Sequence, residues 1–187
     1  MKIITAYRSL GVFLIAAIVT LWPAPLHAGQ DELLAAMDMK PYPAGWDAPH
    51  FGALTATGDS VTLADYRGKV LMVTFWATWC VPCRKEMPAL EELQFKFGDR
   101  GLRVIGINFK EDEAKIRNFA KLYGLSFPLL LDTTGSITKT YGVVAFPTTF
   151  LIGRDGKPIA LAVGERDWLS DAAMALLDAL LRKTPGK

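Results

Sequence analysis

The chain has 187 residues, 51% of them hydrophobic, and carries 21 Lys and Arg against 19 Asp and Glu, for a formal net charge of +2. Lys2 and Arg8 account for the excess, so the remaining charges balance and offer no basic stripe to a nucleic acid. We therefore expect no nucleic-acid partner. The length after an N-terminal leader suits one domain with a proper core.

The first 28 residues predict an export signal. Lys2 and Arg8 give a positive start, residues 10–22 are apolar and uncharged, and Ala28 supplies a small residue at a plausible cleavage point. The apolar run is shorter than the ~20 residues that span a bilayer. We interpret residues 1–28 as a signal peptide, with an uncleaved membrane anchor as the alternative. The expected location is the periplasm, with the protein either soluble or anchored to the inner membrane by its N-terminus.

The rest of the chain alternates between strand and helix patterns. Residues 29–48 predict a short helix (31–39) and a linker rich in Pro and Gly, and residues 49–183 predict the main domain. The expected elements are a hairpin within 51–63, strand 70–76, helix 80–97, strand 103–108, helix 112–123, strand 127–131, a turn and short helix in 132–141, an antiparallel pair 148–152 and 159–163, and an amphipathic helix 168–182 with Asp167 as N-cap. This order predicts an α/β fold, a mixed sheet with helices on both faces.

Cys80 and Cys83 are the only cysteines, and they stand in Trp79-Cys80-Val81-Pro82-Cys83 where a predicted strand meets a predicted helix. The N-terminus of a helix stabilises a thiolate through unpaired backbone N–H groups and the helix dipole. Cys80 is therefore placed to act as the nucleophile. Cys83, one turn on, could resolve a mixed disulfide within the same molecule. The pair predicts thiol–disulfide exchange, with the Cys80–Cys83 disulfide as the redox group and no other cofactor.

Three structural interpretations of the cysteine pair are weaker. A disulfide that closes only four residues would stabilise the fold by roughly 2 kcal/mol, among the smallest gains available. A zinc site needs four protein ligands, and beyond the two thiols the chain has only His27 and His50. Covalent haem attachment needs His after the second cysteine, where Arg84 stands. We expect no metal site.

Two other functions remain as alternatives. The two thiolates could hold Cu(I) and deliver it to a partner, because Cu(I) favours soft sulfur ligands. Cys80 could instead attack peroxide. The thiol peroxidase pattern, however, has Pro seven and Thr or Ser three residues before the nucleophile, and these positions hold Val73 and Ala77. Copper retention and peroxide consumption would distinguish these functions from disulfide exchange.

The motif in residues 69–88, together with Phe146-Pro147-Thr148 and the apolar residues after it, resembles the thioredoxin superfamily. Within that superfamily, the chain is most similar to the exported TlpA-like and ResA-like thiol:disulfide oxidoreductases. The likeness runs from about Pro49 to Arg182. It implies a thioredoxin-like mixed sheet with an N-terminal hairpin and a central strand–helix insertion over residues 103–131.

The resemblance also implies roles for single residues. Pro147 matches the family's cis-proline beside the dithiol, and the backbone of Phe146 would pair with a substrate strand. Trp79 matches a tryptophan that covers the first cysteine, with a core aromatic as the alternative. Glu86 matches a glutamate that tunes the thiols, although on a helix it could equally be solvated.

Plain thioredoxin carries a buried aspartate where this chain has Thr74. Threonine cannot act as a charged proton acceptor, so Glu86 or water would have to replace that route for deprotonating Cys83.

We expect an exported protein thiol:disulfide oxidoreductase, more a reductant than an oxidant, acting on disulfides of periplasmic proteins. An oxidising compartment requires that such a reductant be recharged. The resemblance implies a membrane thiol donor of the DsbD or CcdA type. It also implies substrates in cytochrome c maturation or in assembly of cytochrome oxidase copper sites.

Overall fold

The computed structural model describes residues 28–43 and 45–182, so the predicted leader lies almost entirely outside the described part. None of the described helices has the length and apolar character needed to cross a membrane. The elements are α1 (Ala28–Ala36), β1 (Lys40–Pro41), β2 (Gly52–Leu54), β3 (Ser60–Thr62), the 3₁₀ helix η1 (Leu63–Tyr66), β4 (Val70–Trp76), α2 (Val81–Phe97), β5 (Leu102–Phe109), α3 (Glu113–Tyr123), β6 (Leu129–Asp132), α4 (Ser136–Thr140), β7 (Thr148–Ile152), β8 (Pro158–Val163) and α5 (Asp171–Arg182).

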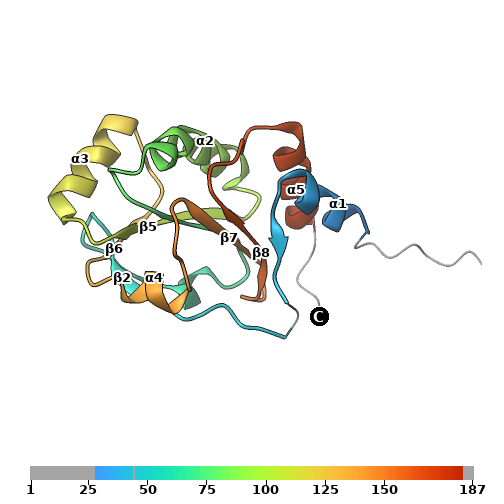
Figure 1. Ribbon diagram of the computed structural model, residues 1–187, viewed down its shortest axis with the longest axis horizontal. Coiled ribbons are helices and arrows are strands. Elements are labelled where there is room, and N and C mark those ends of the chain that lie inside the picture. Colours follow the sequence, from blue (N-terminus) through green and yellow to red (C-terminus); the bar gives the residue numbers. More distant parts are fainter. Residues whose placement is uncertain (1–27, 44, 183–187) are drawn as a thin grey trace, which may run out of the picture.

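Within the described residues, a six-stranded sheet with the order β1-β8-β7-β4-β5-β6 forms the centre of the molecule (Figure 1). The strands β4, β5 and β6 are parallel, whereas β7 runs antiparallel to β4, β8 to β7 and β1 to β8. The hairpin β2–β3 forms a separate two-stranded sheet. The predicted α/β fold with a mixed sheet is therefore confirmed.

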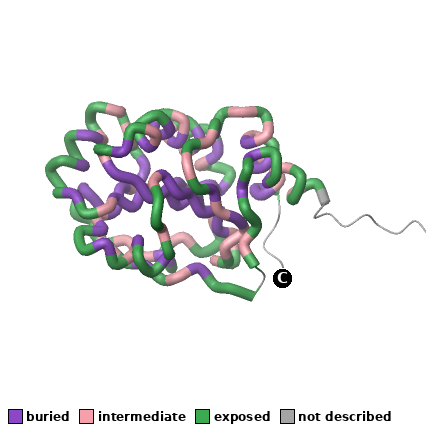
Figure 2. The backbone as a smooth tube through the Cα atoms, viewed as in Figure 1, coloured by how far each residue is buried: buried purple, intermediate pink, exposed green. Residues whose placement is uncertain are grey.

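The strand β4 connects the two halves of the core because its successive side chains point to opposite faces of the sheet. One set packs beneath α1, α2, α3 and α5 and consists of Val70, Met72 and Trp76. The other set packs beneath the hairpin and α4 and consists of Leu71, Val73 and Phe75. All seven residues of β4 are buried, and Figure 2 shows a stretch of buried residues (purple) running through the middle of the molecule. Burial on both faces explains why the sequence of this strand is hydrophobic at every position except Thr74.

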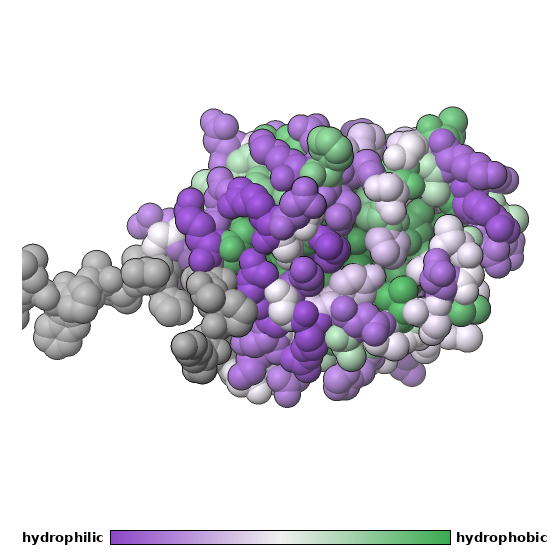
Figure 3. Space-filling model, turned by 180° about the vertical axis from the view of Figure 1, so that it is seen from behind, coloured by the Kyte–Doolittle hydropathy of each residue, from purple (hydrophilic) through white to green (hydrophobic). Residues whose placement is uncertain are grey.

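The surface is mixed in character. On the side turned away in Figure 1, hydrophobic residues reach the surface in patches between hydrophilic ones (Figure 3).

The segment expected to be a short helix and linker, residues 29–48, contributes to the same core. α1 packs against α5, and Leu34, Met37 and Met39 are buried. β1 pairs with β8 at the edge of the sheet, with Lys40 opposite Leu161. α1 occupies residues 28–36 rather than the expected 31–39, because the chain turns at Asp38, where φ is 47°.

The last helix begins later than predicted. α5 starts at Asp171, and the Oγ atom of Ser170 accepts a hydrogen bond from the N–H of Ala173 at 3.3 Å. Ser170 therefore has the N-cap role that we assigned to Asp167. Leu169, which falls within the predicted helix 168–182, lies in the preceding turn and is 39% exposed.

Gly106 in β5 provides a test of how tightly the sheet packs. A Cβ atom at this position would lie 2.7 Å from Leu129 Cδ2 and 2.9 Å from Trp76 Nε1. We predict that Gly106→Ala lowers the free energy of unfolding by about 1–3 kcal/mol, measured by chemical denaturation, because neighbouring side chains must leave their rotamers.

Gly29→Ala in α1 is the matched control. A Cβ atom there meets no atom within 4 Å, so we expect equal or slightly greater stability than wild type, by up to about 1 kcal/mol. Equal effects of the two substitutions would contradict this account of Gly106.

Candidate active site

The two cysteines lie at the N-terminus of α2, directly after the central strand β4. Cys80 is the N-cap residue of α2, and Cys83 follows in the first turn. Their sulfurs form a disulfide across a Cα–Cα distance of 5.3 Å. The backbone N–H of Cys83 donates a hydrogen bond to Cys80 Sγ at 3.2 Å. This sulfur lies where the first N–H groups of the helix point, which stabilises a thiolate once the disulfide is reduced.

Both cysteines are largely buried in this disulfide form. Cys80 is 5% exposed and Cys83 is 1% exposed. Cys80 is only slightly more accessible than Cys83, so the nucleophile that we expect at Cys80 is not exposed in this form. A reacting partner must therefore approach closely around Cys80.

Exposed hydrophobic side chains flank Cys80. Trp79 is 59% exposed and Val81 is 52% exposed. The ring of Phe146 meets Trp79 edge to face at 5.9 Å between centroids, and it meets Phe109 at 5.2 Å. The alternative interpretation of Trp79 as a core aromatic is wrong, because its ring lies at the surface. Trp79, Val81 and Phe146 together form an apolar rim beside the dithiol.

The bond between Phe146 and Pro147 is cis, as the resemblance implies. The carbonyl of Pro147 accepts a hydrogen bond from the N–H of Gly164 at 2.8 Å. Among the described residues, no hydrogen bond involves the backbone N–H or C=O of Phe146. An extended peptide could therefore pair with these two groups.

Glu86 extends from α2 into the core, one turn after Cys83. It is 3% exposed, so the alternative of a solvated glutamate beside Lys85 is excluded. Its Oε1 atom accepts hydrogen bonds from the N–H of Arg166 at 2.5 Å and from the indole N–H of Trp168 at 3.0 Å. Its Oε2 atom is buried and has no hydrogen-bond partner in the described part of the chain.

Burial raises the pKa of Glu86 to about 7, even though the two hydrogen bonds and the charge of Arg166 act in the opposite direction. The nearby carboxylate of Glu165 also raises it. Near neutral pH this group can therefore take up and release a proton. Glu86 also lines a pocket of about 450 Å³ between α2 and the loop that precedes α5, with Lys85, Ala89 and residues 165–168.

Thr74 occupies the middle of β4 and is 1% exposed. Its hydroxyl oxygen accepts a hydrogen bond from the hydroxyl of Thr149 on β7 at 3.1 Å. A hydroxyl paired in this way cannot carry the negative charge that a buried aspartate would supply. Thr74 therefore supplies no charged proton acceptor, and Glu86 or water stays the expected replacement for that route.

Glu111 is a residue of the site that our sequence analysis missed. Its carboxylate accepts hydrogen bonds from the N–H and the hydroxyl of Thr78, both at 2.6 Å, and from the Asn108 amide at 2.9 Å. Lys115 forms an ion pair with it at 2.6 Å. These contacts fix the loop that leads from β4 to Cys80. Glu111 comes just after the carboxyl end of β5, which runs parallel to β4. Functional residues often lie at this edge of a sheet, so its position in the sequence could have indicated it.

The two buried glutamates have opposite protonation behaviour. Burial alone would raise the pKa of Glu111, but the contacts with Lys115, Thr78 and Asn108 outweigh burial and hold the pKa below its usual value. Glu111 is therefore charged at neutral pH, whereas Glu86 titrates there.

Comparison with known proteins agrees with this geometry. The family described as AhpC/TSA matches residues 44–159. The thiol-disulfide oxidoreductase ResA of Bacillus thuringiensis is 43% identical over 122 residues, which cover 65% of this chain and 70% of the relative. The chain belongs to the AhpC/TSA family. The expected resemblance to ResA-like members is confirmed, and the protein is a thiol-disulfide oxidoreductase.

Solved structures support the same assignment. A thiol:disulfide interchange protein of the thioredoxin family from Chlorobium tepidum is 30% identical, with a TM-score of 0.64, and covers 76% of this chain and 97% of its own. A secreted disulfide oxidoreductase of Mycobacterium tuberculosis, homologous to DsbE, is 28% identical with a TM-score of 0.59, and covers 67% of this chain and 96% of its own. The fold of this thiol-disulfide oxidoreductase is therefore thioredoxin-like. In its described residues, no group of three or more His, Cys, Asp or Glu could hold a metal ion.

The role of Glu111 gives a prediction about stability. Glu111→Ala leaves the part-buried N–H of Thr78 and the buried amide of Asn108 without their acceptor, so we expect the free energy of unfolding to fall by about 2–4 kcal/mol in chemical denaturation. Glu113→Ala is the control, because Glu113 forms a half-exposed ion pair with Arg117 at 2.7 Å. We expect that control to cost less than about 0.5 kcal/mol. Comparable losses in both variants would refute a special role for Glu111.

The raised pKa of Glu86 gives a second prediction. The folded protein keeps this proton up to about pH 7, whereas an unfolded glutamate releases it near 4.5. Between these values the folded state binds more protons, so the free energy of unfolding falls as pH rises, by roughly 3 kcal/mol at most. We expect Glu86→Gln to lack this fall when the oxidised protein is denatured chemically at a series of pH values. Parallel curves for wild type and variant would show that burial does not shift this group.

Proposed function

We propose that this thiol-disulfide oxidoreductase is exported and reduces disulfides in other proteins of the periplasm. The observation that carries this proposal is the arrangement on α2. Cys80 caps the helix with an N–H group on its sulfur, and Glu86 is buried one turn beyond Cys83. This arrangement supplies a thiolate, a resolving thiol and a proton acceptor from one helix.

The reaction takes place in two exchange steps. The Cys80 thiolate attacks one sulfur of a substrate disulfide, forms a mixed disulfide and releases the other substrate sulfur as a thiolate, which takes a proton. Cys83 then loses its proton and attacks Cys80 Sγ. This step forms the Cys80–Cys83 disulfide and releases the second substrate sulfur. The substrate gains two electrons from the pair and two protons, one from Cys83 and one from solvent that replaces the proton Cys80 released on ionising.

Glu86 is proposed to serve the second step as a thiol-tuning residue. Residues three apart on a helix are neighbours, so Glu86 and Cys83 lie on the same side of α2. Its pKa of about 7 is close enough to that of an ordinary thiol, about 8.5, for proton transfer between them. Once ionised, Glu86 also opposes a thiolate beside it. This disfavours the reduced form and makes the dithiol a better electron donor.

The apolar rim is proposed to bind the substrate. The backbone of Phe146 would pair with an extended substrate segment beside cis-Pro147, and the exposed ring of Trp79 would pack against it. The rim contains no charged group, which suits a range of partner proteins.

The electrons must come from a donor, since an oxidising compartment keeps the pair as a disulfide. By resemblance we propose a membrane thiol carrier of the DsbD or CcdA type as donor. The substrates we propose are proteins of cytochrome c maturation or of cytochrome oxidase copper-site assembly. Export rests on the leader pattern in residues 1–28 and on the similarity to a secreted oxidoreductase.

Substituting Cys83 tests this mechanism directly. In cells that make the full chain with Cys83→Ser, we predict that exported proteins accumulate as mixed disulfides on Cys80, because nothing resolves them. Non-reducing electrophoresis and mass spectrometry would identify these proteins. The double variant Cys80→Ser, Cys83→Ser is the control and should trap none.

The proposal fails if Cys80 stays unmodified in this experiment and the purified protein cannot reduce a model disulfide. Peroxide consumption or Cu(I) retention by the same reduced protein would then support one of the two alternatives.

A further inference from the structure

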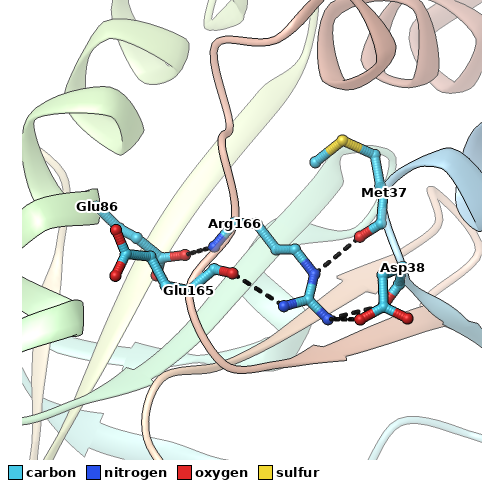
Figure 4. A network of polar contacts seen from close by, with 5 residues as sticks. All are labelled: Met37, Asp38, Glu86, Glu165 and Arg166. Atoms are coloured by element: carbon cyan, nitrogen blue, oxygen red, sulfur yellow. Dashed lines mark hydrogen bonds and ion pairs between the residues drawn. The ribbon is translucent and has the colours of Figure 1, made fainter.

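Arg166 connects two distant parts of the chain to Glu86. It lies between β8 and α5, and its side chain is only 14% exposed. The guanidinium donates to the carbonyls of Met37 and Asp38, both at 2.8 Å, and to that of Glu165 at 2.9 Å (Figure 4). Its backbone N–H donates to Glu86 Oε1. One residue therefore ties the turn after α1 to the carboxyl group on α2.

The turn after α1 has an unusual residue at its tightest point. Asp38 has φ of 47°, in the left-handed region that usually takes Gly after a helix. Its N–H donates to the carbonyl of Ala35, and the N–H of Met39 donates to that of Leu34, both at 2.9 Å. Aspartate tolerates this conformation and adds a carboxylate, which meets Arg166 at 2.7 Å.

The backbone contacts of Arg166 matter more than this ion pair. The Asp38 side chain is 90% exposed, and exposed ion pairs contribute little. The bonds from the guanidinium to backbone carbonyls instead fix the course of the loop. That course brings the N–H of Arg166 and the indole of Trp168 to the same oxygen of Glu86.

We propose that Arg166 is a positioning residue for Glu86, and that the turn after α1 is part of the structure that holds this carboxyl group. The proposal rests on the thiol-tuning role proposed for Glu86. It extends the apparatus of the site to residues 37–38, which lie outside the AhpC/TSA match at residues 44–159.

The charges around Glu86 set the direction of the expected effect. The positive charge of Arg166 lowers the pKa of Glu86, and the negative charge of Glu165 raises it. Lys85 lies 3.7 Å from Glu165 in an exposed ion pair. The indole of Trp168 contributes a neutral N–H. Loss of the guanidinium removes a favourable charge and frees the loop that carries the N–H. Both changes favour the protonated form and raise the pKa of Glu86.

The test is a titration of Glu86 in the full-length oxidised protein by NMR of its carboxyl carbon, assigned by its absence in Glu86→Gln. We expect Arg166→Ala to lower the acid dissociation constant of Glu86 by about tenfold. Arg166→Lys keeps the positive charge but not the several N–H donors of the guanidinium, so its acid dissociation constant for Glu86 should lie between those of Arg166→Ala and wild type. Asp38→Gly keeps the turn and should behave nearly as wild type. If Arg166→Ala fails to fold, Arg166→Gln takes its place.

Arg154 provides the matched control. Its guanidinium also donates to three backbone carbonyls, those of Gly68 at 2.7 Å, Arg100 at 3.2 Å and Leu181 at 3.1 Å. Arg154→Ala should therefore destabilise the fold without moving the Glu86 titration. The proposal is overturned if Arg166→Ala loses stability as Arg154→Ala does and leaves the titration unchanged.

A second measurement separates this proposal from the one on which it rests. If Glu86→Gln leaves the pH profile of disulfide reduction unchanged, the thiol-tuning role is wrong, whatever Arg166 does. If Glu86→Gln changes that profile but Arg166→Ala does not move the Glu86 titration, only the positioning role is wrong.

Discussion

The site depends on how α2 docks on the central sheet. Its first turn places Cys80 Sγ at the N–H of Cys83, and its second turn places Glu86 in the core. These two effects oppose each other, because the helix N-terminus favours a thiolate and an ionised carboxylate nearby disfavours it. In the proposed mechanism, the balance between these two effects sets how readily the dithiol gives up electrons. The helix α2 therefore supplies both the N-terminus that favours the thiolate and the carboxylate that disfavours it. A change in the orientation of α2 would alter both effects together.

Two buried carboxyl groups lie near the start of α2, Glu111 beside the loop before Cys80 and Glu86 in the helix itself. Glu111 is kept charged by four donors and fixes the loop before Cys80. Burial raises the pKa of Glu86 to about 7, and hydrogen bonds to only one of its two oxygens do not offset this, so Glu86 is partly protonated at neutral pH. Two titratable groups whose environments push their pKa values apart can take different roles at one pH. In this protein, Glu111 stays charged and holds a loop in place, whereas Glu86 can take up and release a proton.

Local patterns in the sequence predicted most of the fold and the cysteine pair, whereas contacts between distant segments decided the rest. Continuous hydrophobicity located β4, and apolar spacing with Pro82 in the first turn located α2. The environment of Glu86 depends on Arg166, 80 residues away, so the sequence left its burial open. Glu111 meets Thr78 across 33 residues, and β1 is only two residues long, so neither gives a local periodic signal. Such features become visible only when the strands are placed side by side.

The most direct test of this account is the reduction potential of the Cys80–Cys83 pair, titrated against glutathione in wild type and in Glu86→Gln. Related dithiols span about −120 mV for strong oxidants to about −270 mV for reductants. The account predicts a wild-type value in the reducing half of that span, and a shift to more oxidising values when the carboxyl group is lost. A wild-type potential near −120 mV, or equal potentials in the two proteins, would contradict it.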